Sequence, residues 1–413
     1  MSSSTLDLAS LQVRFDAFKA QNLNLNMTRG KPSPEQLDLA NGMLDVVSSS
    51  DFTAADGTDA RNYGGLNGLT AAEALFAEYM EVSPSELIMG GNSSLAIMHD
   101  TLVRAVLFGT VDSPKPWHKE DKISFLCPVP GYDRHFAVCE LLGIHMMPVP
   151  MNADGPHMDT VEALVRDDPS IRGMWCVPKY SNPGGQTYSD EVINRLAAMP
   201  TAAADFRIMW DNAYAVHHLV SDPPHLKNML RACESAGNPE RVYMFGSTSK
   251  ISLAGAGVAM LAASERNISA LRKQRAVQTI GVDKLNQLRH VRFFNDMNGI
   301  HTHMTGHAAL LKPKFEAVDA VLTRELAEHN VATWSKPQGG YFVSLDTRPG
   351  LAKRVVALAE EAGVKLTPAG ATQPYGNDPE DTNIRLAPSF PSLAEVEQAM
   401  EAVAVAVLLA SST

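Results

Sequence analysis

Two titratable side chains come directly after short apolar runs of the sequence, where buried strands usually end. Asp211 follows residues 207–210, and Lys250 lies a few residues beyond 242–245. If these runs form neighbouring strands, both side chains lie in the crevice beyond the carboxyl ends of the sheet. A lysine that is partly withdrawn from water loses its proton more easily, and its amine can then form an imine with a carbonyl carbon. The alternative is an ordinary solvent-facing lysine in a polar turn.

Small hydroxyl and amide side chains at two places are suited to binding an anion. Residues 90–94 open a predicted helix, and a helix N-terminus carries free N–H groups and positive partial charge. The chain adds further hydroxyl donors just before Lys250. The side chains concerned are Asn92, Ser93, Ser94, Ser247, Thr248 and Ser249. Taken alone, the first stretch is also an ordinary N-cap loop, whereas the two together favour a phosphate site beside the lysine.

Three further polar side chains follow apolar runs, at what would be the same edge of the sheet. Tyr132, Asn182 and Tyr214 each come a few residues after such a run. An aromatic ring at the mouth of a crevice can stack on a planar ligand. The common alternatives are a tyrosine that only packs and, at residues 182–185, an ordinary turn.

The elements that must position these side chains alternate along the chain. Strands that are apolar on both faces are typical of parallel sheets covered by helices. The helix period is visible where Leu95, Met98, Leu102 and Val106 fall on one face. Seven short apolar runs predict strands, at residues 86–89, 123–127, 145–149, 173–177, 207–210, 242–245 and 258–262. The sequence therefore predicts an α/β fold whose large domain has a mainly parallel seven-stranded sheet with helices on both faces.

The two ends of the chain predict a second, smaller domain of the α+β type. The N-terminal part contains one amphipathic helix and a Pro-punctuated segment, 28–34, which must be extended or turning. Residues 302–332 predict a long helix, and residues 335–413 alternate strand, helix, strand and helix. We expect a large domain of residues 56–300 and a small domain built from residues 1–55 and 301–413.

Composition and charge exclude several classes of function. The 413 residues carry 35 Lys+Arg against 46 Asp+Glu, and this net charge of −11 disfavours nucleic-acid binding. No window of about 18 apolar residues occurs and the N-terminus lacks a signal-peptide pattern, so we expect a cytoplasmic protein that does not enter a membrane. The four cysteines form no CxxC pattern and are expected to be buried thiols. No carboxylate or cysteine pattern accompanies His301, His303 and His307, so no metal site is predicted.

Taken together, the motifs at the strand ends resemble those of the fold type I pyridoxal-phosphate enzymes, in particular the class I/II aminotransferases. The resemblance extends from about Asn26 to the last helix. Its motifs are residues 63–68, 90–94, 130–132, 182–185, 211–214, 246–250, 339–342 and 383–386. With the segment that begins at Thr28, the pattern is most similar to a divergent bacterial aspartate aminotransferase subgroup, which is related to the aminotransferase-like half of MocR regulators.

The resemblance implies pyridoxal 5′-phosphate as the cofactor and gives each motif a role. Lys250 would hold the cofactor and move the substrate proton, Asp211 would pair with the pyridine nitrogen, and Tyr132 would stack on the ring. Tyr214 and Asn182 would bond the 3′ oxygen of the ring. The phosphate would be held by Asn92, Ser93, Ser94, Ser247, Ser249 and Tyr63. In the family, the tyrosine that matches Tyr63 comes from the partner subunit, which implies a homodimer with shared sites.

One part of the family pattern is missing. The family usually has an arginine shortly after the lysine, and that arginine neutralises the phosphate. Here the matching position is Gly257 or Val258. Extra hydroxyl donors or a cation from elsewhere in the chain must therefore compensate.

The resemblance also indicates where the substrate binds. Arg385 would hold the α-carboxylate through a two-pronged contact that lysine cannot reproduce, and Asn182 and Gly30 would be further substrate contacts. A dicarboxylate needs a second cation, because an unpaired charge in a closed site is costly. The candidates are Arg29 and Lys31, of which Arg29 is preferred, and the weaker ones are Arg134 and Lys179.

The expected activity is therefore ping-pong transfer of an amino group between L-aspartate and 2-oxoglutarate. A transaminase for an aromatic or 2-aminoadipate-like donor and a C–S β-lyase are the enzyme alternatives. A regulator that only senses pyridoxal phosphate is the alternative from a different class. The short stretch before the substrate segment and the negative charge disfavour it.

Overall fold

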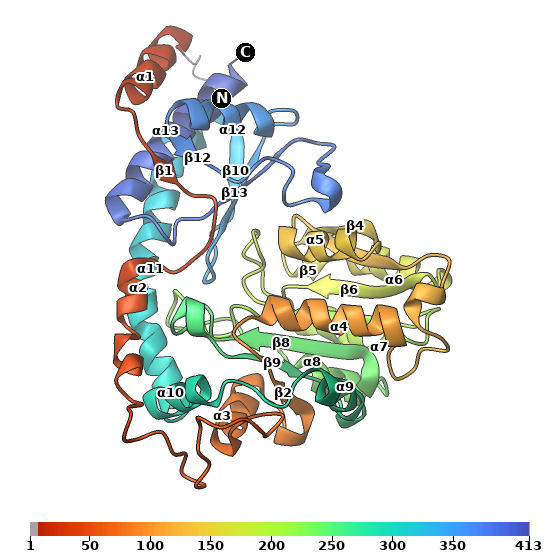
Figure 1. The fold of residues 1–413 in the computed structure, drawn as a ribbon. Coiled ribbons are helices and arrows are strands. Elements are labelled where there is room, and N and C mark those ends of the chain that lie inside the picture. Colours follow the sequence, from red (N-terminus) through yellow and green to blue (C-terminus); the bar gives the residue numbers. More distant parts are fainter. Residues whose placement is uncertain (1–6, 413) are drawn as a thin grey trace.

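The computed structural model describes residues 7–412, and a large mixed sheet lies at its centre (Figure 1). The eight strands follow the order β2-β9-β8-β7-β6-β3-β4-β5. Their bounds are β2 Leu87–Met89, β3 Ser124–Val129, β4 His145–Asn152, β5 Gly155–Pro156, β6 Ile171–Cys176, β7 Arg207–Asp211, β8 Val242–Ser247 and β9 Ala259–Ala262. Each of the seven predicted runs overlaps one strand, which confirms them, although several strands extend beyond their runs. The predicted number is one short because β5 has only two residues, without a hydrophobic pattern, paired antiparallel with the end of β4.

The direction of the strands brings the predicted site residues to one edge. The strands from β8 through β7, β6 and β3 to β4 are parallel. β9 is antiparallel to both of its neighbours, so β2 points the same way as β8. In the register of β7 and β8, Asp211 pairs with Phe245. The carboxyl ends of β2, β3, β6, β7 and β8 therefore meet on the same side of the sheet.

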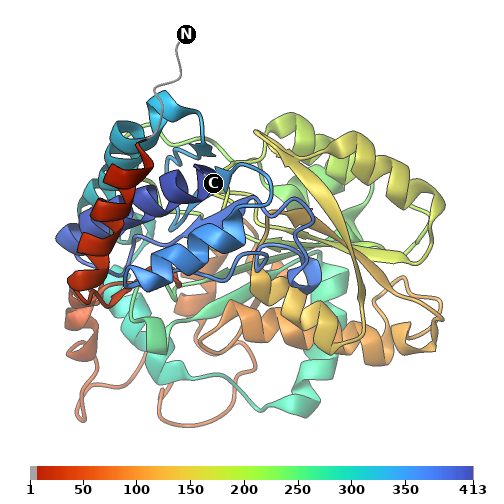
Figure 2. The same ribbon diagram turned by 90° about the horizontal axis from the view of Figure 1, so that it is seen from above.

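Helices cover both faces of this sheet, as predicted, and the alternation of side chains along each strand explains why. In β8, Tyr243 and Phe245 belong to the core on one face, whereas Val242 and Met244 belong to the core on the other. The first face carries α4 Ser94–Phe108, α5 Asp133–Leu141 and α9 Glu265–Gln278. The second carries α3 Thr70–Met80, α6 Met158–Asp167, α7 Asp190–Ala198, α8 Met229–Ser235 and α10 Lys284–Phe294. Figure 2 shows the yellow-green helices on one side and the orange α4 on the other.

A smaller α+β unit contains both ends of the described chain, which lie close together in Figure 1. One three-stranded antiparallel sheet and one parallel pair belong to it, with strands β10 Ala332–Trp334, β11 Val343–Thr347 and β13 Asn383–Leu386, and with β1 Leu25–Asn26 beside β12 Val364–Lys365. Its helices are α1 Leu8–Ala20, α2 Pro34–Asp38, α11 Met297–Leu326, α12 Ala352–Glu361 and α13 Leu393–Ser411. Leu11 and Phe15 share a core with α13, so the two ends of the chain stabilise one unit.

The long helix α11 joins the two units and differs in its bounds from the predicted 302–332. It begins earlier because the Asp296 carboxylate accepts a hydrogen bond from the backbone N–H of Gly299 at 2.9 Å and so caps the first turn. It ends earlier because the chain turns at Asn330, whose φ of 50° is left-handed. The predicted boundary between residues 300 and 301 falls inside this helix; the domain limits stay predictions.

The structure also bears on the classes that composition disfavours. All four cysteines are free and buried, as expected. Within residues 7–412, no helix is long and apolar enough to cross a membrane. In the same part of the chain, no group of three or more His, Cys, Asp or Glu side chains is arranged to hold a metal ion.

Candidate active site

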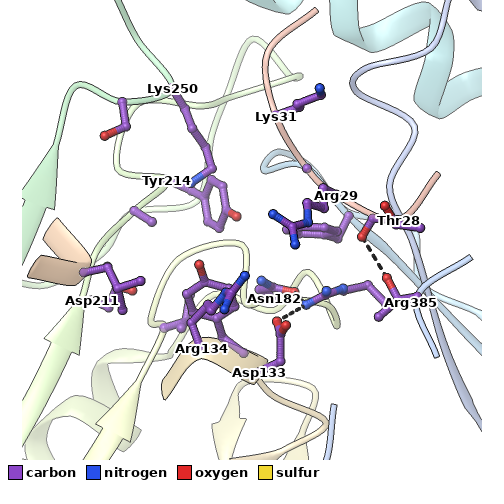
Figure 3. Close-up of a pocket in the computed structure, with 18 of the residues that line it drawn as sticks. Thr28, Arg29, Lys31, Asp133, Arg134, Asn182, Asp211, Tyr214, Lys250 and Arg385 are labelled. Carbon is purple, nitrogen blue, oxygen red and sulfur yellow. Dashed lines mark hydrogen bonds and ion pairs between the residues drawn. The ribbon is translucent and has the colours of Figure 1, made fainter. Parts of the chain in front are cut away.

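A cavity of about 760 Å³ opens at the carboxyl ends of the strands, where they face the smaller unit (Figure 3). Most of the predicted site residues line it: Arg29, Gly30, Ser93, Ser94, Tyr132, Asn182, Asp211, Tyr214, Ser247, Ser249, Lys250 and Arg385. Asn92 lies just outside this lining. Tyr63 lies away from the cavity of its own chain, with its side chain 81% exposed.

Lys250 lies in a tight turn after β8. Thr248 closes this turn, because its N–H donates to Val258 O at 2.9 Å and its hydroxyl accepts from Val258 N–H at 2.8 Å. The Lys250 Nζ lies 5.2 Å from the centroid of the Tyr214 ring. Burial lowers the pKa of Lys250, while the Asp211 carboxylate acts in the opposite direction. A lysine in this environment supplies the neutral amine that imine formation requires.

Asp211 ends β7 and is almost completely buried. Its Oδ2 lies 2.9 Å from Nε2 of His135. Its Oδ1 is buried and has no hydrogen-bond partner among the described residues. Because Asp211 lines the cavity, Oδ1 is the oxygen that is left to bond a ligand atom. A buried acceptor without a partner is unfavourable, so this position favours a ligand that carries an N–H group.

The sequence-based reasoning missed His135, which orients Asp211. The imidazole stacks on Trp175 with ring centroids 4.1 Å apart and an angle of 5° between the planes, so its position is fixed by packing. His135 comes three residues after Tyr132 at the start of α5, and the two ring centroids are 4.9 Å apart. That spacing places both side chains on one helix face and is the signal that could have identified it.

The two tyrosines of the cavity are protonated hydrogen-bond donors. Burial raises the pKa of Tyr132 to about 12, and the charge of Asp211 acts in the same direction. Burial also raises the pKa of Tyr214 well above its ordinary value, with Tyr132 and Asp211 adding to the effect. Both phenols can therefore donate to an oxygen atom of a ligand.

The structure brings the two predicted groups of hydroxyl side chains together. Ser247 Oγ donates to Ser249 Oγ at 3.1 Å, and Ser249 Oγ donates to the carbonyl oxygen of Asn92, also at 3.1 Å. Ser93 is the N-cap of α4, but its hydroxyl makes no capping bond. The free N–H groups at the start of α4 and these hydroxyls form a site suited to a phosphate.

Asn92 and the turn that follows Lys250 separate this site from a smaller cavity of about 290 Å³. The Asn92 amide donates to Gly255 O at 3.2 Å. A Cβ atom at Gly257 would come within 3.2 Å of Asn92 O and Ser249 N, so a glycine allows the turn to approach closely. Arg289 lines the smaller cavity, and its buried Nε has no hydrogen-bond partner within residues 7–412. It is thus a cation close to the site where the family's arginine is missing.

Arg385 lies on β13 and reaches the cavity from the smaller unit (Figure 3). Its Nη1 donates to Asp133 Oδ1 at 2.7 Å and to Asn182 Oδ1 at 3.5 Å. Its Nε is buried without a partner in the described part of the chain. The Asp133 carboxylate, which sequence reasoning also missed, therefore occupies a position that a substrate carboxylate could take.

The segment before α2 lines the cavity on the same side as Arg385, since Gly30 and Arg385 both lie against the Phe342 ring. A Cβ atom at Gly30 would lie 2.5 Å from Cζ of Phe342, so only glycine lets the backbone pass this ring. Arg29, Lys31 and Arg134 all line the cavity, and Lys31 Nζ also lies 3.8 Å from the centroid of the Phe390 ring. Lys179 is buried, does not line the cavity, and has a pKa that burial lowers.

Comparisons with known proteins agree with this geometry. The profile of the family described as aspartate amino-transferase matches residues 1–413. An aspartate aminotransferase of Corynebacterium glutamicum is 50% identical over 399 residues, which cover 97% of this chain and 92% of that protein. The chain therefore belongs to the aspartate aminotransferase family and is a transferase of amino groups.

Solved structures show the same fold over the full length. The crystal structure of an aspartate transaminase from Corynebacterium glutamicum has a TM-score of 0.96 and 48% identity, and the match covers 100% of this chain and 99% of that chain. LysN, an α-aminoadipate aminotransferase from Thermus thermophilus, has a TM-score of 0.77 and 21% identity over 97% of this chain and 98% of its own. That protein was solved as a complex with N-(5′-phosphopyridoxyl)-L-leucine.

Proposed function

We propose that this protein uses pyridoxal 5′-phosphate to transfer the amino group of L-aspartate to 2-oxoglutarate by a ping-pong route. One observation carries this proposal. A single cavity contains a lysine whose pKa burial lowers, a buried carboxylate with an unpartnered oxygen and an arginine from the smaller unit. These are the groups needed to bind a pyridine ring, an aldehyde and an amino acid.

The residues present fit the cofactor. Asp211 Oδ1 lacks a partner within the described chain and suits a protonated pyridine nitrogen. Ser93, Ser94, Ser247 and Ser249 line the same cavity and suit a phosphate. When bound, pyridoxal phosphate supplies the electron sink for the charge that develops at the substrate α-carbon.

The side chains of the cavity then divide the work. Lys250 Nζ would hold the cofactor at its aldehyde carbon, and the free amine would carry the proton of the substrate α-carbon. Asp211, held by His135, keeps the pyridine nitrogen protonated. Tyr214 and Asn182 donate to the ring oxygen, and Tyr132 covers one face of the ring.

Substrate binding is assigned to two cations on different elements. Arg385 binds the α-carboxylate through Nη1 and Nη2, and this exchange displaces Asp133. Arg29 binds the distal carboxylate of aspartate from the segment before α2, which lines the same cavity. Gly30 and Asn182 complete the contacts to the substrate.

The proposal includes a homodimer in the cytoplasm. Tyr63 is exposed and does not line the cavity of its own chain, which agrees with a role at the cavity of a second copy. Tyrosine is enriched at protein interfaces, where its ring is buried and its hydroxyl can still bond. Asn92 reaches the phosphate through its backbone, because its side chain bonds Gly255.

The test is a panel of amino donors followed by the visible absorbance of the bound cofactor. Aspartate should convert the absorbance to that of the aminated cofactor, and 2-oxoglutarate should restore it. A higher kcat/KM for 2-aminoadipate or an aromatic donor would refute the aspartate assignment but not the transaminase. Pyruvate release from a β-substituted donor would favour a lyase. A coloured protein that ignores every donor would favour a sensor.

A further inference from the structure

The segment that carries Arg29 and Lys31 is attached to the smaller unit. The carbonyl oxygen of Thr28 accepts a hydrogen bond from Thr367 Oγ1 at 2.8 Å. The carbonyl oxygen of Lys31 accepts one from Ser389 Oγ at 3.0 Å. Beyond these contacts the segment enters α2, whose Gln36 is completely buried. The position of the two cations thus depends on these two bonds and on the contacts that hold α2.

The hydrogen bonds of Gln36 have a fixed direction. The backbone N–H of Ser33 lies 3.1 Å from Gln36 Oε1, and a backbone N–H can only donate. The amide oxygen must therefore face Ser33, and the NH₂ group faces the other way. There Nε2 lies 3.0 Å from His307 Nδ1 and 2.9 Å from the hydroxyl oxygen of Tyr341. Gln36 donates to both.

The same direction of hydrogen-bond donation extends from Gln36, through His307 and Tyr341, to the main chain at the active-site lysine. Because His307 Nδ1 accepts, its proton is on Nε2, which lies 2.9 Å from the carbonyl oxygen of Ile251. Because the Tyr341 hydroxyl accepts from Gln36, its own proton is free to donate to the carbonyl oxygen of Lys250, at 3.4 Å. Burial lowers the pKa of His307 to about 4, so the ring is neutral and keeps this polarity.

Other imidazoles strengthen the same two carbonyl contacts. His303 Nε2 lies 2.7 Å from Ile251 O, and His217 Nε2 lies 3.2 Å from Lys250 O. The Gln36 side chain therefore connects the segment that carries Arg29 to the lysine turn. On one side it bonds Ser33, and on the other it bonds His307 and Tyr341, which contact the carbonyl oxygens of Ile251 and Lys250. The Gln36 network, formed by Gln36, His307 and Tyr341, bridges the two units beside the cavity.

We propose that Gln36 is a positioning residue that sets the place of the 28–33 segment and the place of the Lys250 main chain together. Distal-carboxylate recognition and cofactor capture then share one buried contact, although Gln36 touches neither ligand. The inference rests on the proposed function, because it needs Lys250 to bind the cofactor and Arg29 to bind the distal carboxylate. It predicts that both the rate of cofactor capture and the preference for aspartate over alanine depend on Gln36.

Three variants separate the branches of the network. Gln36→Met removes the amide oxygen and the amide NH₂ group with little change in side-chain length. Tyr341→Phe removes the hydroxyl contacts to Lys250 O and to Gln36 Nε2, and it leaves the bonds of Gln36 with Ser33 and His307. Asn267→Leu is the matched control, since this buried amide on α9 bonds the Tyr243 hydroxyl and the Glu240 carbonyl oxygen and does not line the cavity. Urea unfolding reports the loss of stability in each.

The experiment measures how fast the apo-protein captures pyridoxal phosphate, by the visible absorbance, and the ratio of kcat/KM for aspartate to that for alanine. Gln36→Met should slow capture and lower the ratio, each by roughly fivefold, as expected for one lost hydrogen bond. Tyr341→Phe should slow capture and leave the ratio unchanged. Asn267→Leu should change neither.

Two results would overturn the inference. One is a Gln36→Met protein that is less stable but captures the cofactor at the native rate. The other is a Tyr341→Phe protein that loses as much preference for aspartate as Gln36→Met does. A native chain that captures no pyridoxal phosphate would instead refute the proposed function, so the two failures are distinguishable.

Discussion

The replacement of Arg385 by lysine tests how the cavity binds a substrate carboxylate. Arg385 is buried on β13, with Nη1 bonded to Asp133 and Nε without a partner among the described residues. A carboxylate that displaces Asp133 can accept from Nη1 and Nη2 together, because these two groups have parallel N–H bonds. Lysine retains the charge but offers a single ammonium group, so one of two charge-assisted hydrogen bonds is lost.

The size of the effect follows from that count. One hydrogen bond to a charged group contributes about 1.5–3 kcal/mol, which corresponds to a decrease in kcat/KM of about 10- to 150-fold. Because every amino acid has an α-carboxylate, Arg385→Lys should decrease kcat/KM for aspartate and alanine equally. Arg29→Ala should instead decrease kcat/KM for aspartate far more than for alanine, because alanine has no distal carboxylate.

The assay is steady-state kinetics with aspartate and alanine as donors and 2-oxoglutarate as the acceptor. Arg348→Lys, at an exposed position of the smaller unit, is the control for the exchange itself and should leave both values unchanged. A loss below about threefold for Arg385→Lys would refute two-pronged binding. A loss confined to aspartate would mean that Arg385 binds the distal carboxylate.

Three more predictions concern neighbouring groups. Asp133→Asn should lower the KM for aspartate about fivefold, because an amide competes less well with the substrate for Arg385; an unchanged or higher KM would contradict this. Arg289→Gln should weaken pyridoxal phosphate binding about tenfold in fluorescence titrations if this arginine is the phosphate counter-charge, and an unchanged Kd would rule that out. Burial lowers the pKa of His290 and of His307 from 6.5 to about 4, so the folded protein keeps them neutral while the unfolded chain takes up protons. The free energy of unfolding in urea should therefore fall as the pH is lowered from about 6.5 to 4, and a constant value over this interval would contradict the burial argument.

The sequence predicts the large sheet well because parallel strands buried on both faces have continuous apolar runs. All seven runs correspond to strands of this sheet. Only β5 was not predicted, since a two-residue strand at the edge of the sheet has no hydrophobic pattern. The observed ends of α11 differ from the predicted ones because capping by Asp296 and the left-handed Asn330 act locally. The hydrophobic period of the sequence does not show these local effects.

The site divides in the same way. Residues directly after strands, such as Asp211 and Lys250, could be predicted, because sheet topology alone places them at one edge. His135 and Asp133 lie on a helix, and Gln36 lies far away in the sequence. Their contacts with Asp211, Arg385 and the lysine turn depend on packing between elements, which a single sequence does not specify.

The most direct test of the central claim is to find which side chain carries the cofactor. The native protein is reduced with borohydride in the presence of pyridoxal phosphate, digested, and mapped by mass spectrometry, in parallel with Lys250→Ala. We predict the pyridoxyl group on the peptide that contains Lys250, and neither a modified peptide nor amino transfer in the variant. A pyridoxyl group on a different lysine, or a variant that still transfers nitrogen at the native rate, would contradict the account.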